Sequence, residues 1–412
     1  MNLTTVISNT TNKLKTQYSF EFLVENYILI LILLIPVNLS KHFILESSYV
    51  AGSFVDYLSP AIFASDFVLL TLLVFLIFLV LRRRRLVVNK TLLVLALLLI
   101  VTTALNPSPS GLAAMLRFLV FALTTLFLKN FRAGSYFYKL LPPTISLAVF
   151  WQSVWGLSQF TIQRNLCGYL CFGETTLSPL SFGVTKEFFG ERQLILPYGT
   201  FPHPNVLAGF LSLSLTILLY FFLTSRRKYL IPVLVLGFMT LLLTKSDSAY
   251  LVFGIGVVTL LTHFWRQVAS DLSFLTVFSL SLTRRFDLSN AALETIRQRP
   301  LLGVGTGNFV RSLTETSYSP GWPPFWQPVH NLYLLWAAEN GLPFLFVFCF
   351  LFFVIFKRLY QIRSFLPLLL LAQVLILSLL DHYFWTTAPG LLMFWLVLGV
   401  SQMSPLTKPL KK

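Results

Sequence analysis

Residues 205–224 read NVLAGFLSLSLTILLYFFLT, a run without a single charged side chain. As an α-helix rising about 1.5 Å per residue, this run is about 30 Å long, which matches the hydrocarbon core of a membrane. It is followed at once by Ser225-Arg-Arg-Lys228, and basic clusters of this kind flank membrane spans on the cytoplasmic side. The stretch therefore predicts a transmembrane helix whose basic end faces the cytoplasm.

Similar apolar runs recur along the whole chain. Of its 412 residues 56% are hydrophobic and 11% are charged, whereas soluble domains carry about 25% charged residues. A soluble protein is therefore excluded, and we expect an all-α polytopic membrane protein with about 12 transmembrane helices. The predicted spans are 22–40, 59–81, 91–106, 111–128, 138–158, 205–224, 229–244, 249–264, 268–283, 342–357, 364–380 and 389–404.

The distribution of charge orients these spans. The chain has 31 Lys and Arg residues against 15 Asp and Glu, a net charge of +16. About 20 of the basic residues fall in alternate connections, which the positive-inside rule assigns to the cytoplasm. We therefore expect both termini to be cytoplasmic, with an uncleaved first span and no cleavable signal peptide. Because the positive charge follows from topology, it does not indicate a nucleic-acid partner.

Two connections on the opposite side are long. Loops of this length are uncommon unless they are functional, and both are rich in aromatic residues, Gly and Pro. We expect them to contain short helices, to fold over the outer membrane surface and to form a cavity. The predicted organisation is 1–158 (N-terminal transmembrane helices), 159–204 (first long extracytoplasmic loop), 205–283 (central transmembrane helices), 284–341 (second long extracytoplasmic loop) and 342–412 (C-terminal transmembrane helices and cytoplasmic tail).

The first long loop ends in the proline-rich run Pro197-Tyr-Gly-Thr-Phe-Pro-His-Pro-Asn205. Prolines fix the backbone, and Asn is a favoured N-cap, so we predict that Asn205 caps the helix that follows. Earlier in the loop, the spacing of Cys167 and Cys171 fits a local disulfide and two free thiols equally well. The sequence shows neither metal-ligand spacing nor a nucleotide-binding glycine loop, so no metal and no cofactor are expected.

In the second long loop, Asp287 to Gln298 has the periodicity of an amphipathic helix. Pro300 ends this helix, and Gly303-Val-Gly-Thr-Gly-Asn308 follows as a turn that glycine permits. A further helix is expected to start near Pro328. The apolar face of the amphipathic helix is formed by Leu288, Ala291, Ala292 and Ile296.

His330 is the histidine best placed for proton transfer, because it falls in the first turn of the helix expected from Pro328. The dipole at a helix N-terminus disfavours imidazolium, so the ring stays neutral and can accept a proton. We therefore predict that His330 is a general base. The other four histidines are interpreted as structural residues at span ends and turns: His42, His203, His263 and His382.

Arginines gather in the two outer loops. A guanidinium at a membrane surface needs an anionic partner, and it can bind a phosphate through two parallel hydrogen bonds. Neighbouring carboxylates would pair with about half of these arginines. Arg192 and Arg285 stand out because each lies where an outer loop meets a membrane helix. The loop arginines considered are Arg192, Arg284, Arg285, Arg297, Arg299 and Arg311.

Three segments together resemble the O-antigen ligase superfamily of bacterial envelope glycan ligases and polymerases. The segments are GTFPHPNVLAGFL (199–211), RRFDLSNAALETIRQRPLLGVGTGNF (284–309) and PVHNLYLLWAAENGLP (328–343). The resemblance implies a GT-C-like, metal-independent glycosyltransferase in the plasma (inner) membrane of a bacterium. Such an enzyme would move a glycan from undecaprenyl diphosphate to an acceptor hydroxyl on the outer face. The acceptor would be a glycan, a lipid A core or a protein.

The resemblance also implies roles for individual residues. His330 matches the family's catalytic histidine, and Arg192 and Arg285 match arginines that bind the donor diphosphate. After the seventh span Asp247 stands where the family often has an arginine, so Lys245 would substitute only in part, as a point charge. Arg284 is a further candidate for the diphosphate. Supporting roles fall to Asn205, Asn331 and Glu339.

Three alternatives remain open. A repeat-unit polymerase and a protein O-oligosaccharyltransferase of the same superfamily differ from a ligase only in the acceptor. A non-catalytic lipid or polysaccharide transporter belongs to a different class, and it would need paired carboxylates or broken helices at mid-membrane. The acids in or beside the predicted spans are isolated from one another: Asp66, Asp247 and Asp271.

Overall fold

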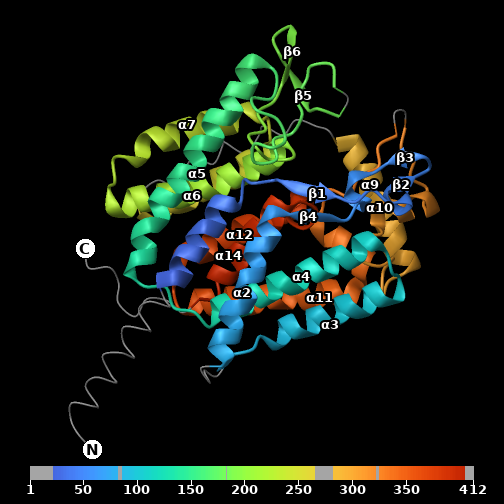
Figure 1. The fold of residues 1–412 in the computed structure, drawn as a ribbon, viewed down its shortest axis with the longest axis horizontal. Coiled ribbons are helices and arrows are strands. Elements are labelled where there is room, and N and C mark those ends of the chain that lie inside the picture. Colours follow the sequence, from blue (N-terminus) through green and yellow to red (C-terminus); the bar gives the residue numbers. More distant parts are fainter. Residues whose placement is uncertain (1–21, 82–85, 182, 265–281, 322–323, 404–412) are drawn as a thin grey trace, which may run out of the picture.

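The computed structural model describes residues 22–81, 86–181, 183–264, 282–321 and 324–403, and helices make up most of them (Figure 1). They are a first helix Phe22–Leu34, α2 (Ala64–Leu81), α3 (Lys90–Leu105), α4 (Pro109–Lys129), α5 (Ser135–Ile162), α6 (Pro204–Ser225), α7 (Leu230–Leu243), α8 (Asp247–Phe264), α9 (Leu282–Gln298), α10 (Phe309–Ser312), α11 (Leu332–Gln361), α12 (Phe365–Leu380), α13 (Tyr383–Thr386) and α14 (Ala388–Val400). The chain is therefore a helical membrane protein, as predicted.

Four helices in the described ranges are long and apolar enough to cross a membrane, namely α4, α6, α8 and α11. Every predicted span overlaps a helix, but of 268–283 only the last two residues, at the start of α9, are among the described residues. The first helix ends at Leu34 and α2 begins only at Ala64, because prolines stand at positions 36 and 60 and interrupt helices. The total of about 12 transmembrane helices stays a prediction.

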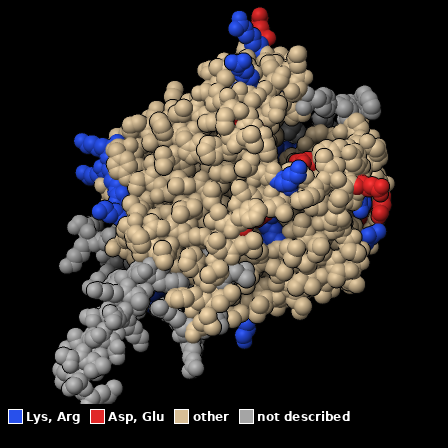
Figure 2. Space-filling view, in the orientation of Figure 1, with Lys and Arg blue, Asp and Glu red and all other residues tan. Residues whose placement is uncertain are grey.

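The outer surface of the helices is apolar. Large side chains such as Phe67, Leu97 and Phe346 are 65%, 61% and 73% exposed. Figure 2 shows that charged side chains are few over the helices and that several project at the margins of the molecule. In water such a surface would aggregate, whereas in a bilayer the lipid tails cover it at no cost.

Helix α6, which contains the opening stretch, is the central helix of the fold. Of its most apolar stretch, 72% is buried inside the protein, the largest buried share among the four long apolar helices. Polar side chains fasten it to its neighbours: the Gln373 amide of α12 donates to the Thr216 hydroxyl of α6 and to the Val252 carbonyl of α8, both at 3.0 Å. Glycines allow close approach, since a Cβ at Gly209 would lie 2.2 Å from the Tyr383 hydroxyl.

The connections predicted to be cytoplasmic meet at one end of the helices. The Arg358 guanidinium near the end of α11 donates to the carbonyl of Gln402 at 2.7 Å, just after α14. The Asn89 amide before α3 donates to the Gln402 side chain at 2.9 Å. The alternation of predicted sides is therefore consistent with the packing, while the orientation in a membrane and the location of both termini stay predictions.

The outer segments contain three short antiparallel two-stranded sheets, which the all-α prediction did not include. The strands are β1 (Ser40–His42) with β4 (Ala61–Phe63), β2 (Tyr49–Val50) with β3 (Ser53–Phe54), and β5 (Lys186–Phe189) with β6 (Arg192–Ile195). Short strands of this kind need only a few backbone pairs, so they leave a weak sequence pattern.

The first long loop is organised around a buried acid. Glu174 accepts the backbone N–H groups of Leu166, Cys167 and Gly168 at 2.7, 2.8 and 2.7 Å. Burial alone raises the pKa of this carboxyl, but these hydrogen bonds and one from Gln159 lower it overall, so Glu174 stays ionised. Cys167 and Cys171 form a disulfide within the same turn. Of the two alternatives, a local disulfide and two free thiols, the structure has the disulfide.

The second long loop has the predicted amphipathic helix, α9. Leu288, Ala291 and Ala292 are at most 1% exposed, as the apolar stripe requires. The glycine turn then packs against the backbone of α11, since the N–H of Val304 donates to Ala338 at 2.9 Å and that of Gly305 to Glu339 at 2.8 Å. Both predictions are confirmed.

Helix α11 is broken at Gly341, where φ is 82° and ψ is 166°. This conformation is essentially confined to glycine. The break lets the N–H of Leu342 donate to the carbonyl of Pro300 at 2.8 Å, so 332–340 and 342–361 run as two helices. A Cβ at position 341 would lie 2.1 Å from the carbonyl oxygen of Leu301.

We expect Gly341→Ala to lower the thermal stability of the detergent-solubilised protein. The backbone strain alone costs about 1–3 kcal/mol, and the clash with Leu301 adds to it. The measurement is the melting temperature. Gly254→Ala is the matched control, because a Cβ there meets nothing within 4 Å and alanine favours a helix. Equal melting temperatures for the two variants would show that the break at Gly341 is not required.

Candidate active site

Three histidines and an acid meet at the outer end predicted for α6, α11 and α12. His203 precedes α6, His330 precedes α11, and Asp381 and His382 lie between α12 and α13. The rings of His330 and His382 are 4.9 Å apart at their centroids in an edge-to-face arrangement. One ligand-type atom each from His330, Asp381 and His382 lies within 4.8 Å of the other two. We call these three residues the His–Asp cluster.

His330 lies just outside α11, so its predicted place in the first turn is wrong. The N-cap is Asn331, whose side chain accepts the N–H groups of Tyr333 and Leu334 at 3.0 and 3.1 Å. The amide oxygen of Asn331 can accept these N–H groups only if the helix begins directly after it, and so the helix does not begin at Pro328. Nδ1 of His330 is buried and has no hydrogen-bond partner among the described residues. A ring nitrogen is therefore left available.

His330 is neutral at pH 7. Burial lowers the pKa of His330 below its ordinary value of 6.5, and Arg285 lowers it further, while Asp381 opposes both. The predicted direction holds, but burial is the main cause and the helix dipole is not needed for it. The ring can therefore accept a proton at neutral pH.

Asp381 is the buried anion of the site. Its Oδ1 accepts the backbone N–H of His382 at 2.7 Å, and its Oδ2 accepts the Asn205 amide at 3.2 Å. Burial raises the pKa of Asp381, but His382, His330 and Arg285 together lower it below its ordinary value. Asp381 is therefore an ionised carboxylate that faces the histidines.

Asn205 does not cap α6, which corrects the prediction. His203 is the N-cap, because its Nδ1 accepts the backbone N–H of Asn205 at 3.1 Å. Nε2 then carries the ring proton and faces the Thr185 hydroxyl at 3.0 Å. The ring reaches the helix end across Pro204, which leaves the Asn205 side chain free to bind Asp381. Burial is the main reason that the pKa of His203 falls from 6.5 to about 4.

Arg285 brings positive charge to the same place. It lies in the first turn of α9, and its guanidinium donates to the Leu380 carbonyl at 3.4 Å, one residue before Asp381. Its charge lowers the pKa of Asp381, His330 and His382 alike. The structure therefore joins Arg285 to the His–Asp cluster, as the sequence suggested. The side chain of Arg284 lies outside the described residues.

Arg192 and Lys245 lie together elsewhere. Arg192 is exposed on β6 and stands opposite Phe189 of β5. The Lys245 ammonium, between α7 and α8, lies 5.0 Å from the centroid of the Phe189 ring. In Figure 1 this hairpin projects at the top of the molecule, whereas α9 lies at the right. The structure thus places Arg192 on the hairpin and the Lys245 ammonium over its Phe189 ring.

Glu339 supports the glycine turn. It is buried and accepts the Trp385 indole N–H at 3.3 Å, as well as the backbone N–H groups of Gly307 and Phe309. The carboxylate thereby ties the second long loop to α11 and α13. A supporting role for Glu339 in the reaction stays a prediction.

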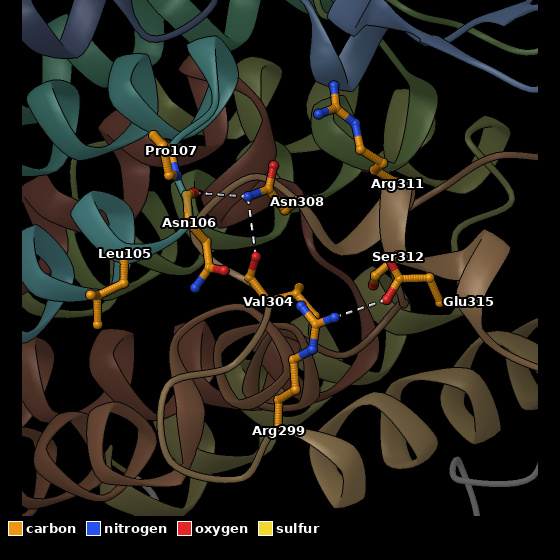
Figure 3. A pocket seen from close by; sticks show the side chains of 9 residues that line it. All are labelled: Leu105, Asn106, Pro107, Arg299, Val304, Asn308, Arg311, Ser312 and Glu315. Atoms are coloured by element: carbon orange, nitrogen blue, oxygen red, sulfur yellow. Dashed lines mark hydrogen bonds and ion pairs between the residues drawn. The ribbon is translucent and has the colours of Figure 1, made fainter.

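A cavity of about 280 Å³ opens between the turn joining α3 to α4 and the second long loop (Figure 3). At one side Arg299 pairs with Glu315 at 3.0 Å, and across the cavity the Asn308 amide donates to the Asn106 carbonyl at 3.1 Å. The second long loop therefore forms a cavity, as expected, but with the α3–α4 turn in place of the first long loop. No lining residue belongs to the His–Asp cluster.

Sequence analysis missed Asp381 and interpreted His382 as structural. Both are at most 5% exposed, and they stand side by side directly after the apolar run of α12. An acid and a histidine adjacent at the outer end of a span were the available signal. The contact with His330 is non-local, so neither residue's spacing along the chain indicated it.

Residues 205–349 match the family model described as O-antigen ligase. The match runs from Asn205 through Arg285 and His330 to the second half of α11, while Asp381 and His382 lie beyond it. No curated protein sequence matches the chain. The matched segment is about a third of the chain and contains the second and third motifs and the end of the first, so over these residues the protein is similar to the O-antigen ligase family.

Proposed function

We propose that this protein is a glycosyltransferase that moves a glycan from undecaprenyl diphosphate to an acceptor hydroxyl on the outer face of a bacterial plasma membrane. The observation that supports this best is the meeting of His330, Asp381 and Arg285 at one end of the helices. A base, an anion beside it and a cation for a leaving phosphate are the groups this reaction needs. No cofactor has a part in it, because the activated donor supplies the energy.

In the proposed reaction the acceptor oxygen attacks the anomeric carbon of the donor glycan. The bond between that carbon and the diphosphate oxygen breaks, and its electron pair leaves with the diphosphate. His330 accepts the hydroxyl proton at a neutral ring nitrogen, for which Nδ1 has no competing partner among the described groups. Asp381 stabilises the imidazolium that forms, since its charge raises the pKa of His330.

Arg285 is the proposed partner of the departing diphosphate. It already faces the cluster, and a guanidinium can bind phosphate oxygens with two donors at once. Arg192 lies on the β5–β6 hairpin and the Lys245 ammonium lies over its Phe189 ring, and we assign both cations to donor contacts farther from the reacting carbon. Arg284 shares α9 with Arg285 and is retained as a further candidate.

The acceptor separates the alternatives within the superfamily. A ligase would transfer the glycan to a lipid A core, a polymerase to another lipid-linked repeat, and an O-oligosaccharyltransferase to a protein. The acceptor that accumulates without glycan in a deletion strain distinguishes the three. The transporter alternative gives no role to a base that lies beside a cation for a leaving phosphate, and passage of the lipid by the parent without any glycan transfer would favour it.

We expect His330→Ala to lower glycan transfer by about 10²–10⁴-fold, the usual contribution of a general base. The measurement is turnover of lipid-linked donor in membranes that contain equal amounts of inserted protein. His263→Ala is the matched control, because His263 stacks on Phe365 at 3.8 Å, remote from this site in the fold. Turnover of His330→Ala at the parental rate would contradict the assignment of His330 as the general base.

We expect Arg285→Lys to impair use of the lipid-linked donor, because lysine keeps the charge but loses the two-donor fork. The apparent KM for donor or kcat/KM should change by about tenfold or more, which corresponds to about 1.4 kcal/mol. Arg363→Lys, at the turn between α11 and α12, is the control. Equal activities of the two variants would contradict a diphosphate role for Arg285.

The pH dependence of transfer should follow from the lowered pKa of His330. A base acts when it is neutral, so the rate should be level around pH 7 and should fall only below the ordinary histidine pKa of 6.5. In Asp381→Asn the opposing negative charge is lost, so the fall should move to still lower pH while the plateau rate drops. If lowering the pH already reduced the rate at values above pH 6.5, His330 could not be the base.

A further inference from the structure

We propose that the His–Asp cluster binds a divalent transition-metal ion, preferably Zn²⁺. The bound ion would block the proposed base, His330. The site consists of His330, Asp381 and His382, whose ligand-type atoms lie within 4.8 Å of one another. Binding of the ion does not depend on the proposed function, but its inhibitory effect rests on that function.

The chemistry of these three groups suits zinc. Two imidazoles and one carboxylate are a common set for this ion, and such sites keep a fourth position open for water or substrate. A tetrahedral ion with bonds of about 2.1 Å needs its ligand atoms about 3.4 Å apart. Binding of the ion therefore requires the ligand atoms to move together by no more than about 1.4 Å.

The hydrogen bonds orient the ligands correctly. The Thr386 hydroxyl donates to the carbonyl of His382 at 3.2 Å, so Nδ1 of His382 donates to that hydroxyl oxygen at 2.8 Å. The lone pair of His382 is then on Nε2. A metal-bound histidine generally has its second nitrogen fixed in this way. His330 needs no rearrangement of bonds, because Nδ1 has no partner in the described part of the chain.

His203 lies near the cluster but is not a ligand. Its Nδ1 accepts the N–H of Asn205 at 3.1 Å, and its Nε2 faces Thr185 at 3.0 Å. Both ring nitrogens are therefore occupied by the cap of α6. The remaining neighbour is Arg285, whose positive charge repels a metal cation. Its position predicts that zinc binds more weakly here than in a site without a guanidinium.

The ion would occupy the same nitrogen lone pair that takes the acceptor proton. Zinc bound to His330 leaves no base for the hydroxyl, so transfer stops until the metal is removed. The reaction itself needs no metal, and the site acts as a point of inhibition.

The test uses the full chain, purified in detergent and dialysed against zinc-buffered solutions, with bound zinc counted by mass spectrometry. We expect one Zn²⁺ per chain in the parent and at least about 10–100-fold weaker binding in His382→Ala and in Asp381→Asn. His42→Ala is the matched control and should bind as the parent does, because His42 is not a member of the His–Asp cluster and its Nδ1 lies 3.1 Å from the exposed carboxylate of Asp56. Equal binding by parent and His382→Ala would overturn the site.

Arg285→Gln makes the test independent of misfolding. Removing the guanidinium charge should tighten zinc binding, by about tenfold, while it weakens donor use. A variant that merely unfolds cannot gain affinity, so unchanged or weaker binding would count against the site.

The activity arm uses the parent with its lipid-linked donor. Zinc should abolish transfer over the range in which it binds, and a chelator should restore it. Binding without inhibition would refute the blocking of the base. A parent protein that transfers glycan but binds no zinc at any concentration tested would overturn the metal site and leave the proposed function standing.

Discussion

The buried carboxylate of Asp381 is the group on which the arrangement of the outer end depends. An ion removed from water is costly unless it is paired and hydrogen-bonded. Asp381 meets this requirement through the Asn205 amide of α6, the backbone of His382 and the charge of Arg285 on α9. Helices far apart in the chain are thereby held to one anion, and the proposed base faces it.

The same pairing explains why the site lies at helix ends. Within the hydrocarbon region a helix leaves no free backbone donors, whereas the turn after α12 offers the N–H of His382 to a carboxylate. The break at Gly341 has a related effect, because it lets the loop backbone of Pro300 bond to α11. At both places the irregular backbone is buried within the protein.

Sequence reasoning succeeded where the signal was local. Apolar runs and the stripe of α9 repeat with fixed periods, so the helices and the buried face of Leu288 and Ala292 could be predicted. Two errors share a cause: Asn205 and His330 were both assigned by their position relative to a helix end. Which side chain caps a helix depends on how far each ring or amide reaches, as His203 and Asn331 show.

The place of Arg285 beside the cluster also resolves a conflict in the chemistry. A desolvated, unpartnered imidazole is a good base for the reason that it is a good metal ligand, since both uses need its lone pair. Asp381 favours either cation, the proton or the metal, while Arg285 disfavours both. Burial is the main reason that His330 stays neutral between turnovers, and the guanidinium adds to this effect from the position where the proposed reaction needs positive charge for a leaving diphosphate. The positive charge of Arg285 would thus act both on the resting site and on the proposed reaction.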